Sequence, residues 1–261
     1  NMNMDSLKYE EIPQRIKRFC LFDDEFMGRV FDENIECTEL LLNIILDRTD
    51  IEIIDVHTQR EIRNLRGHSV RLDIEAKSKA GELIDVEVQR SNKGADVKRA
   101  RYNVSVMDAN TLVKGEDYDK LPECYCVFIT EKDVMGMGMP IYHADRVISE
   151  TGKCLGDGTH IVYVNGAYRG NNPIGKLMHD FSCENSSDMF YRELAGQVKY
   201  YKENEKGVAA MSKIVEELID MEKKEIALKM VKDGKLQEED VIKYFGFSLE
   251  QNEEHQEVQT V

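Results

Sequence analysis

The sequence predicts a mixed α/β fold in which a helix, three strands, a second helix and a fourth strand follow one another, with further helices toward the end. Three observations support this order: residues 71–78 and 82–89 alternate between apolar and polar side chains, residues 124–130 are mostly apolar, and helical spacing dominates after Pro173. The chain has 261 residues, of which 41% are hydrophobic. A chain of this size can bury one sizeable core and carry a helical appendage.

The first predicted helix covers residues 36–46, and the first predicted strand covers residues 51–56. Apolar side chains recur at helical spacing in the helix, at Leu40, Leu41, Ile44 and Ile45. The same segment carries two acids three positions apart, Glu36 and Glu39.

Residues 71–78 and 82–89 are predicted to form a hairpin of two half-buried strands. The loop between them is Lys79, Ala80 and Gly81, and its glycine can adopt the left-handed conformation that such loops usually need. If Ser78 lies opposite Glu82, the loop sets the register of the whole pair. This register places Ile74 opposite Val86, Leu72 opposite Val88, Asp73 opposite Glu87, Arg71 opposite Gln89, and Glu75 opposite Asp85.

The predicted register gathers acidic side chains on one face of the hairpin. Like charges directly opposite each other destabilise a sheet by about 1 kcal/mol or less. A divalent cation held by Asp73 and Glu87 would remove that cost, since Mg²⁺ takes oxygen ligands from one or two carboxylates. The alternative is a solvated acidic ladder without a function, because polar residues on the outer face of a hairpin are common.

The run from Arg71 to Arg90, RLDIEAKSKAGELIDVEVQR, resembles the core of the PD-(D/E)XK nucleases. In that superfamily an Asp on one strand and a (D/E)-x-K triplet on the next hold a metal ion and orient water. This chain has Leu72 in place of the proline and Gln89 in place of the lysine. Its Glu-x-Gln variant resembles the PD-(D/E)XK nuclease family transposases, which are related to the recombination-promoting (Rpn-type) nucleases. Further matching stretches extend the resemblance over residues 19–217: FDENIECTELLLNIIL, CYCVFIT and IGKLMHDFSCENSSDMFYRELAGQVKYYK.

The resemblance implies a restriction-endonuclease-like mixed sheet with an αβββαβ core, and a DNA endonuclease that hydrolyses phosphodiester bonds with Mg²⁺ or Mn²⁺. It implies that Asp73, Glu87 and the backbone carbonyl of Val88 are metal ligands, and that Gln89 completes the catalytic set. Because glutamine donates only neutral hydrogen bonds, Gln89 is expected to slow the reaction relative to lysine. Members of the superfamily often supply another acid from the first helix, and Glu39 is the candidate here.

Two alternatives to the endonuclease stay open. One is a catalytically weak or inactive relative that binds DNA or a protein partner. The other is a metal-dependent phosphodiesterase that acts on RNA or another phosphoester.

The formal net charge of −15 opposes non-specific attraction to nucleic acid, but residues 90–101 form a local basic patch. Five cations there, Arg90, Lys93, Lys98, Arg99 and Arg101, face one acid, Asp96. In the expected helix, an apolar stripe of Val97, Ala100, Val104 and Met107 lies opposite Lys98, Arg99, Tyr102 and Ser105. The predicted contacts to a DNA backbone are Lys98, Arg99, Arg101 and Tyr102. The alternative is a solvated helix face.

The second half of the core is predicted from further strand patterns. Residues 124–130 form an apolar strand, and residues 142–150 and 159–164 form an additional hairpin around the turn-rich sequence GKCLGDG. The sequence leaves open whether this hairpin joins the main sheet.

Three regions are expected: a nuclease-like domain at residues 1–175, a helical extension at residues 176–249, and an acidic, disordered tail at residues 250–261. The extension begins with a helix capped by Ser186, Ser187 or Asp188. After Gly207, a heptad-like stripe of Val208, Met211, Val215 and Leu218 predicts packing within the chain or, alternatively, a homodimer contact. The stretch KLQEEDVIKYFGFSLEQ looks like a helix-turn-helix unit but lacks a basic face.

Cysteine and histidine patterns point to no zinc site at this stage. The six cysteines are expected to be reduced thiols, with Cys124 and Cys126 as small hydrophobic side chains on one face of a strand. The six histidines are interpreted as scattered, without Cys/His clustering. No apolar run is long enough for a membrane span, and the first residues lack the apolar region of a signal peptide, so a cytoplasmic protein is expected.

Overall fold

The structure is a computed structural model, and it describes residues 4–63, 68–90 and 95–248. The chain divides into two compact units. One is Lys17–Val208, and the other combines the residues up to Ile16 with those from Ala209 onward. The larger unit includes residues 176–208 of the predicted helical extension, and the division into three regions stays a prediction. Lys93 and the tail at residues 250–261 lie outside the described residues.

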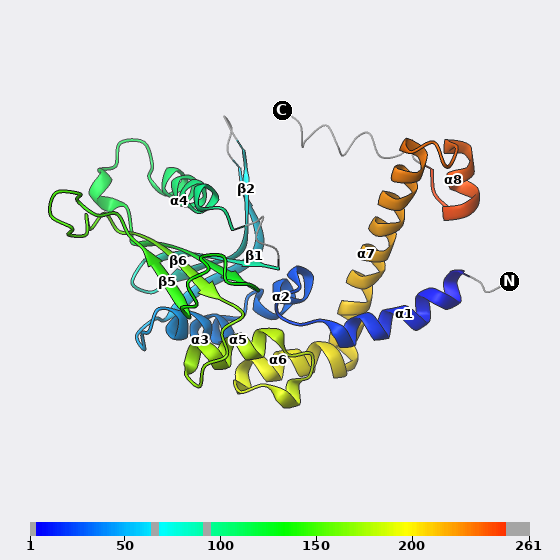
Figure 1. The fold of residues 1–261 in the computed structure, drawn as a ribbon, viewed down its shortest axis with the longest axis horizontal. Coiled ribbons are helices and arrows are strands. Elements are labelled where there is room, and N and C mark those ends of the chain that lie inside the picture. The colour runs from blue at the N-terminus through cyan, green and yellow to red at the C-terminus, as the bar shows by residue number, and fades with distance from the viewer. Residues whose placement is uncertain (1–3, 64–67, 91–94, 249–261) are drawn as a thin grey trace. The chain divides into compact units, whose positions relative to one another are not determined.

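A six-stranded mixed sheet forms the centre of the larger unit (Figure 1). Its strands are β1 (Ile53–Ile62), β2 (Val70–Ser78), β3 (Leu83–Gln89), β4 (Cys124–Thr130), β5 (Ile141–Ala144) and β6 (Thr159–Asn165), in the order β1-β2-β3-β4-β6-β5. The first three strands are antiparallel, whereas β3, β4 and β6 are parallel. The αβββαβ order is confirmed. The additional hairpin, β5 and β6, joins the main sheet, although its first strand ends at Ala144.

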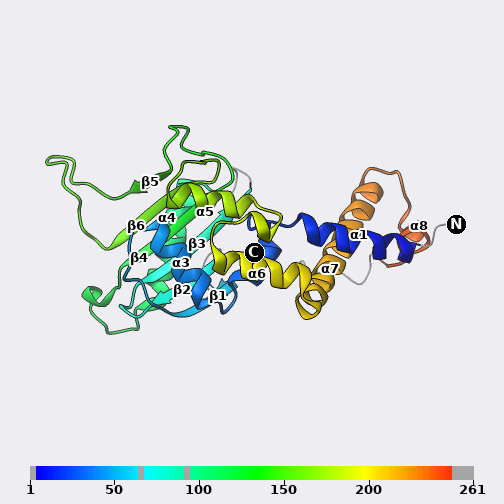
Figure 2. The same ribbon diagram turned by 90° about the horizontal axis from the view of Figure 1, so that it is seen from below.

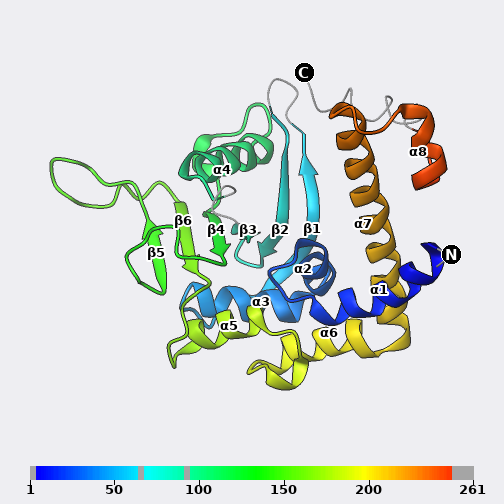
Figure 3. The same cartoon turned by 45° about the vertical axis from the view of Figure 1, so that its right-hand side comes forward.

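Helices cover both faces of this sheet. The helices of the described chain are α1 (Met4–Arg18), α2 (Asp24–Phe31), α3 (Ile35–Ile45), α4 (Val97–Thr111), α5 (Pro173–Ser182), α6 (Arg192–Glu203), α7 (Glu205–Lys232) and α8 (Glu238–Phe245). One face is covered by α4, and the opposite face by α3, with α5 packed on α3 (Figures 1 and 2). The short helix α2 packs against β1 and β2 (Figure 3).

The predicted hairpin register is confirmed for the pairs Ile74–Val86 and Glu75–Asp85. Ile74 pairs with Val86, and the Ser78 amide donates to the Glu82 carbonyl at 3.0 Å. Gly81 has a φ of 93°, which lies in the left-handed region that favours glycine. The ladder between β2 and β3 is recorded from Lys77–Leu83 to Ile74–Val86, so the acidic pair expected at residues 73 and 87 lies just beyond it.

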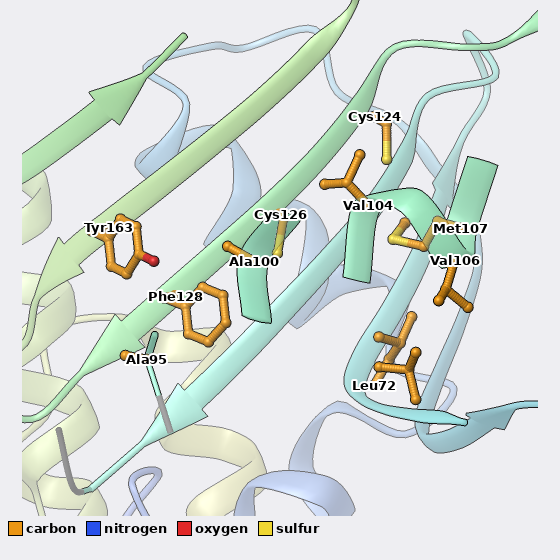
Figure 4. Packing of buried hydrophobic residues seen from close by; sticks show 11 residues of the cluster. Leu72, Ala95, Ala100, Val104, Val106, Met107, Cys124, Cys126, Phe128 and Tyr163 are labelled. Atoms are coloured by element: carbon orange, nitrogen blue, oxygen red, sulfur yellow. The ribbon is translucent and has the colours of Figure 1, made fainter. Parts of the chain in front are cut away.

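A hydrophobic cluster fills the space between α4 and the sheet (Figure 4). Cys124, Cys126 and Phe128 lie on the same face of β4, and the Phe128 ring stacks on Tyr163 with 5.4 Å between ring centroids. The two cysteines therefore act as small hydrophobic side chains, as predicted, and all six cysteines are free thiols. The predicted stripe on α4 is confirmed from Ala100 onward, but Val97 is 61% exposed because the helix starts there.

The helix cap predicted at Ser186, Ser187 or Asp188 is wrong. These residues form a 3₁₀ turn, and α6 starts only at Arg192. The carboxylate of Asp180 accepts hydrogen bonds from the amides of Phe190 and Tyr191, which fixes the preceding segment outside a helix. The helical conformation stops at Asn204, so α6 and α7 are two consecutive helices.

The smaller unit is helical. In α7, Met211 and Val215 are fully buried in the single chain, and Arg15 of α1 donates two hydrogen bonds to Glu222 at 3.0 and 2.6 Å. The heptad-like stripe therefore packs within the chain. The helix α8 ends at Gly246, whose φ is 81°, and the second helix of the expected helix-turn-helix unit would fall outside the described residues. Within those residues, no helix is both long and apolar enough to cross a membrane.

Candidate functional site

Asp73 and Glu87 lie at the point where the ladder between β2 and β3 ends. Both are buried, with exposed fractions of 6% and 0%. The amide of Val88 donates to Asp73 Oδ2 at 3.0 Å, and the amide of Asp73 donates to Glu87 Oε1 at 3.4 Å. Each carboxylate thus accepts a hydrogen bond from a backbone amide of the opposite strand. In a regular ladder, a backbone carbonyl would accept this hydrogen bond.

Two residues that the sequence did not single out complete this arrangement. Gln59 of β1 has a φ of 55°, an uncommon conformation for a residue other than glycine. Its Nε2 donates to Asp24 Oδ1 at 2.6 Å and to Asp73 Oδ1 at 3.4 Å. Gln59 therefore links the first residue of α2 to the acid of β2. Side chains from α2, β1, β2 and β3 meet at one place.

This place is the wall of an open cleft of about 660 Å³. The cleft is lined by Phe22, Asp23, Asp24, Glu25, Ser69, Val70, Arg71, Asp73, Val88, Gln89, Arg90 and Arg99. The structure does not bring Glu39 to it. The Glu39 carboxylate instead accepts a hydrogen bond from the Ile53 amide at 2.7 Å, at the start of β1. The helical acid beside Asp73 is Asp24, from α2 rather than α3.

Gln89 and Arg99 bring hydrogen-bond donors to the two acids. The Nε2 of Gln89 lies 3.5 Å from Asp73 Oδ2, which is the long limit of a hydrogen bond. Arg99 forms an ion pair with Glu87, and its guanidinium lies 5.8 Å from the centroid of the Phe128 ring. The positive charge at this site thus comes from Arg99 of α4. Gln89 brings only a neutral amide to the strand position where the PD-(D/E)XK pattern has lysine.

The residues of the predicted basic face of α4 do not all face solvent. Arg99 turns into the cleft rather than toward solvent. The hydroxyl of Tyr102 donates to the backbone carbonyl of His68 at 2.6 Å. Lys98 and Arg101 are exposed, and neither lines the cleft.

Burial and mutual repulsion act on the carboxylates of the sheet. Burial, followed by the charges of Asp85 and Asp73, raises the pKa of Glu87 to about 10. Burial raises the pKa of Asp73 to about 6, with a further contribution from Asp24, and that of Asp85 to about 7. Asp85 is turned away from the cleft, where it accepts hydrogen bonds from Asn103 Nδ2 at 3.0 Å and Cys126 Sγ at 3.3 Å.

The donors that face the cleft suit a hard divalent cation. Asp24 and Asp73 bring carboxylate oxygens to the lining of the cleft, and Glu87 is buried next to Asp73 without lining it. No sulfur or imidazole ligand lines the cleft among the described residues. Mg²⁺ and Mn²⁺ prefer such oxygen ligands. The arrangement can therefore hold a divalent ion beside the arginines of the rim.

A family model described as PD-(D/E)XK nuclease family transposase matches residues 29–166. The matched range contains Gln59, Asp73, Glu87, Gln89 and Arg99. It does not contain Asp24 or the helices α5 and α6. No curated protein and no solved structure matches the chain.

Proposed function

The chain belongs to the PD-(D/E)XK nuclease family transposases, and on that premise we propose that it is a metal-dependent DNA endonuclease that hydrolyses phosphodiester bonds in the cleft between α2 and the end of the β2–β3 pair. One observation carries the proposal. Two buried carboxylates are held against each other's strands: Asp73 lies at the wall of an open cleft near Asp24, and Glu87 lies behind it. The label transposase is used for the family alone, and strand joining is no part of the proposal.

The residues present fit a divalent ion. Their raised pKa values reflect carboxylates that burial and neighbouring charges have destabilised, and a cation would relieve both effects. Asp73, Glu87 and the carbonyl of Val88 would hold Mg²⁺ or Mn²⁺. When bound, the ion supplies polarisation of the scissile phosphate and a water molecule of lowered pKa.

Arg99 has two proposed roles in this reaction. Through its ion pair it orients Glu87, and because it lines the cleft it offers a charge-assisted donor to a phosphate oxygen. Gln89 contributes only neutral hydrogen bonds at the position where the family pattern has lysine. We therefore assign to Arg99 the positive charge that the strand position lacks.

The rim of the cleft offers further phosphate contacts. Arg71 and Arg90 line it, and their side chains are 63% and 49% exposed. Arginine forms bidentate contacts with phosphate, so a local row of arginines can bind a DNA backbone despite the negative net charge. Lys98 and Arg101, on the exposed face of α4, would extend these contacts.

The second candidate function is a DNA- or protein-binding module with little or no activity. The ion pair between Arg99 and Glu87 favours it, because a tightly paired Glu87 binds a metal ion less readily. Both functions predict DNA binding, so cleavage separates them.

The test is nicking of supercoiled plasmid DNA by the full chain with Mg²⁺ or Mn²⁺. Asp73→Ala removes a metal ligand, and we expect a loss of at least about 10³-fold, since a catalytic metal contributes several kcal/mol. Asp55→Ala, which removes an exposed acid of β1 outside the cleft, is the matched control and should keep its activity. Equal nicking by the Asp73 variant, or none by the wild type, would reject the endonuclease.

The substrate is tested in the same assay. Duplex DNA, single-stranded DNA and RNA of one sequence are offered in competition, and we expect cleavage of DNA in preference to RNA. Preferential cleavage of RNA would support the phosphodiesterase alternative instead.

A further inference from the structure

A second group of metal-binding side chains lies at the end of α5, outside the cleft. It consists of His179, Asp180 and Cys183, whose ligand atoms all lie within 4.8 Å of one another. The Nδ1 atom of His179 lies 3.3 Å from Asp180 Oδ1 and 3.5 Å from Cys183 Sγ. No residue of this group lines the cleft. The nuclease chemistry does not use any of the three.

The two distances from His179 Nδ1 are close to the edges of a tetrahedral zinc site. Zinc binds nitrogen and oxygen at about 2.0–2.2 Å and sulfur at about 2.3 Å. At tetrahedral angles such bonds separate nitrogen from oxygen by about 3.4 Å and nitrogen from sulfur by about 3.6 Å. The separations of 3.3 and 3.5 Å are close to both values. Cys183 Sγ also lies 3.8 Å from His179 Nε2, so the sulfur lies over the imidazole ring, and the His179 ring must rotate to bind one ion together with Cys183 and Asp180.

The carboxylate of Asp180 is already held in place by groups around it. It is fully buried, and its two oxygens accept hydrogen bonds from the amides of Phe190 and Tyr191, both at 2.8 Å. Hydrogen bonds of this kind orient the ligands of metal sites. The ring of His179 also packs edge-on against Phe190, with 4.8 Å between ring centroids. Asp180 is thus oriented before an ion binds.

A reactive thiol is the competing interpretation of this group. Nucleophilic cysteines have a lowered pKa. Burial, followed by the charge of Asp180, instead raises the pKa of Cys183 to about 11. The thiol is therefore not activated by its surroundings.

We propose that His179, Asp180 and Cys183 bind one zinc ion, with water in the fourth position, and that this ion fixes the segment joining α5 to α6. The segment is also held by Lys202, whose ammonium donates to the Glu184 carbonyl and, at 2.5 Å, to that of Phe19. The site would stabilise the fold near α2, and it is independent of the nuclease reaction. The interpretation that the sequence has no Cys/His clustering is wrong, because His179 of α5 and Cys183, the residue that follows this helix, come within 3.5 Å of each other.

The experiment uses the full chain, freed of metal with a chelator and then titrated with Co²⁺ as a spectroscopic substitute for Zn²⁺. We expect tetrahedral d–d bands and a sulfur-to-cobalt charge-transfer band at one equivalent, and loss of both when Zn²⁺ is added. Cys183→Ser should abolish the charge-transfer band, and His179→Gln should weaken Co²⁺ binding at least about tenfold. Cys154→Ser, which removes an exposed thiol, is the matched control and should leave the spectrum unchanged.

Circular dichroism of each variant shows whether it is folded. Asp73→Ala should keep the charge-transfer band, since the cleft offers no sulfur ligand. Absence of the band in the folded wild type would overturn the proposal, and so would its persistence in Cys183→Ser. If Cys183→Ser does not fold, His179→Gln decides by the same affinity criterion, and unchanged Co²⁺ affinity in it would overturn the proposal.

Discussion

Asp73 and Asp180 are both buried aspartates that accept backbone hydrogen bonds, but their surroundings differ. Both oxygens of Asp180 accept amide hydrogen bonds at 2.8 Å. Asp73 accepts one amide hydrogen bond at 3.0 Å, and Glu87 and Asp24 lie nearby. The first carboxylate is stabilised by the fold, whereas the second is destabilised by its neighbours. Asp73 is therefore the acid whose burial we expect to depend more on a bound cation, whereas Asp180 keeps its two amide hydrogen bonds with or without zinc.

The largest predicted difference between these two aspartates is in the free energy of unfolding. Asp180→Ala leaves the partly buried amides of Phe190 and Tyr191 without their acceptor, and we expect the free energy of unfolding to fall by about 2–4 kcal/mol. Asp73→Ala leaves one amide, that of Val88, without its acceptor but also removes a repelled charge, so the metal-free protein should lose much less stability. Chemical denaturation of both variants in the presence of a chelator measures the difference. Equal destabilisation by the two substitutions would show that the distinction is false.

The next prediction compares an arginine that lines the cleft with an arginine on the exposed surface of α4. Arg99→Ala should lower kcat for plasmid nicking about 10²-fold, by the loss of a charge-assisted contact. Arg101→Ala, on the same helix but outside the cleft, should leave kcat unchanged and weaken DNA binding in a salt-dependent way. Steady-state kinetics at two salt concentrations distinguish the variants. If both arginines lowered only the affinity for DNA, Arg99 would have no role in the reaction.

The smallest effect concerns pH. The pKa of Asp85 is raised to about 7, above its ordinary value, so the folded state favours its protonated form. Its contribution to stability is therefore complete below about pH 4 and is lost as the pH rises through 7. Asp85→Asn should raise the free energy of unfolding at pH 8 by about 1–3 kcal/mol and have little effect at pH 4. Denaturation curves at both pH values test this, and a gain that does not depend on pH would contradict it.

The sequence predicted those parts of the fold that depend on local patterns. The register of β2 and β3 follows from period-2 alternation and a glycine loop, and it placed Asp73 near Glu87 correctly. The bounds of β4 were predicted for the same reason, since Cys124–Thr130 is a short apolar run. Such signals are contained within a few neighbouring residues.

The missed residues depend on contacts between distant segments. Gln59 meets Asp24 across 35 positions of the chain, and neither residue belongs to a motif that marks it. Helical spacing placed Arg99 on the solvent side of α4, but its long side chain reaches back to Glu87 at the edge of the buried face. Glu39 was chosen for its helix alone, and the start of β1 uses its carboxylate instead.

Binding of Mn²⁺ to the purified chain, followed by electron paramagnetic resonance, tests the central claim most directly. We predict that the wild type binds Mn²⁺ and so lowers the signal of free Mn²⁺ until its sites are saturated. Asp73→Asn and Glu87→Gln should each fail to do so at the same concentrations, whereas Asp55→Asn should bind like the wild type. Undiminished Mn²⁺ binding by both cleft variants would contradict the account.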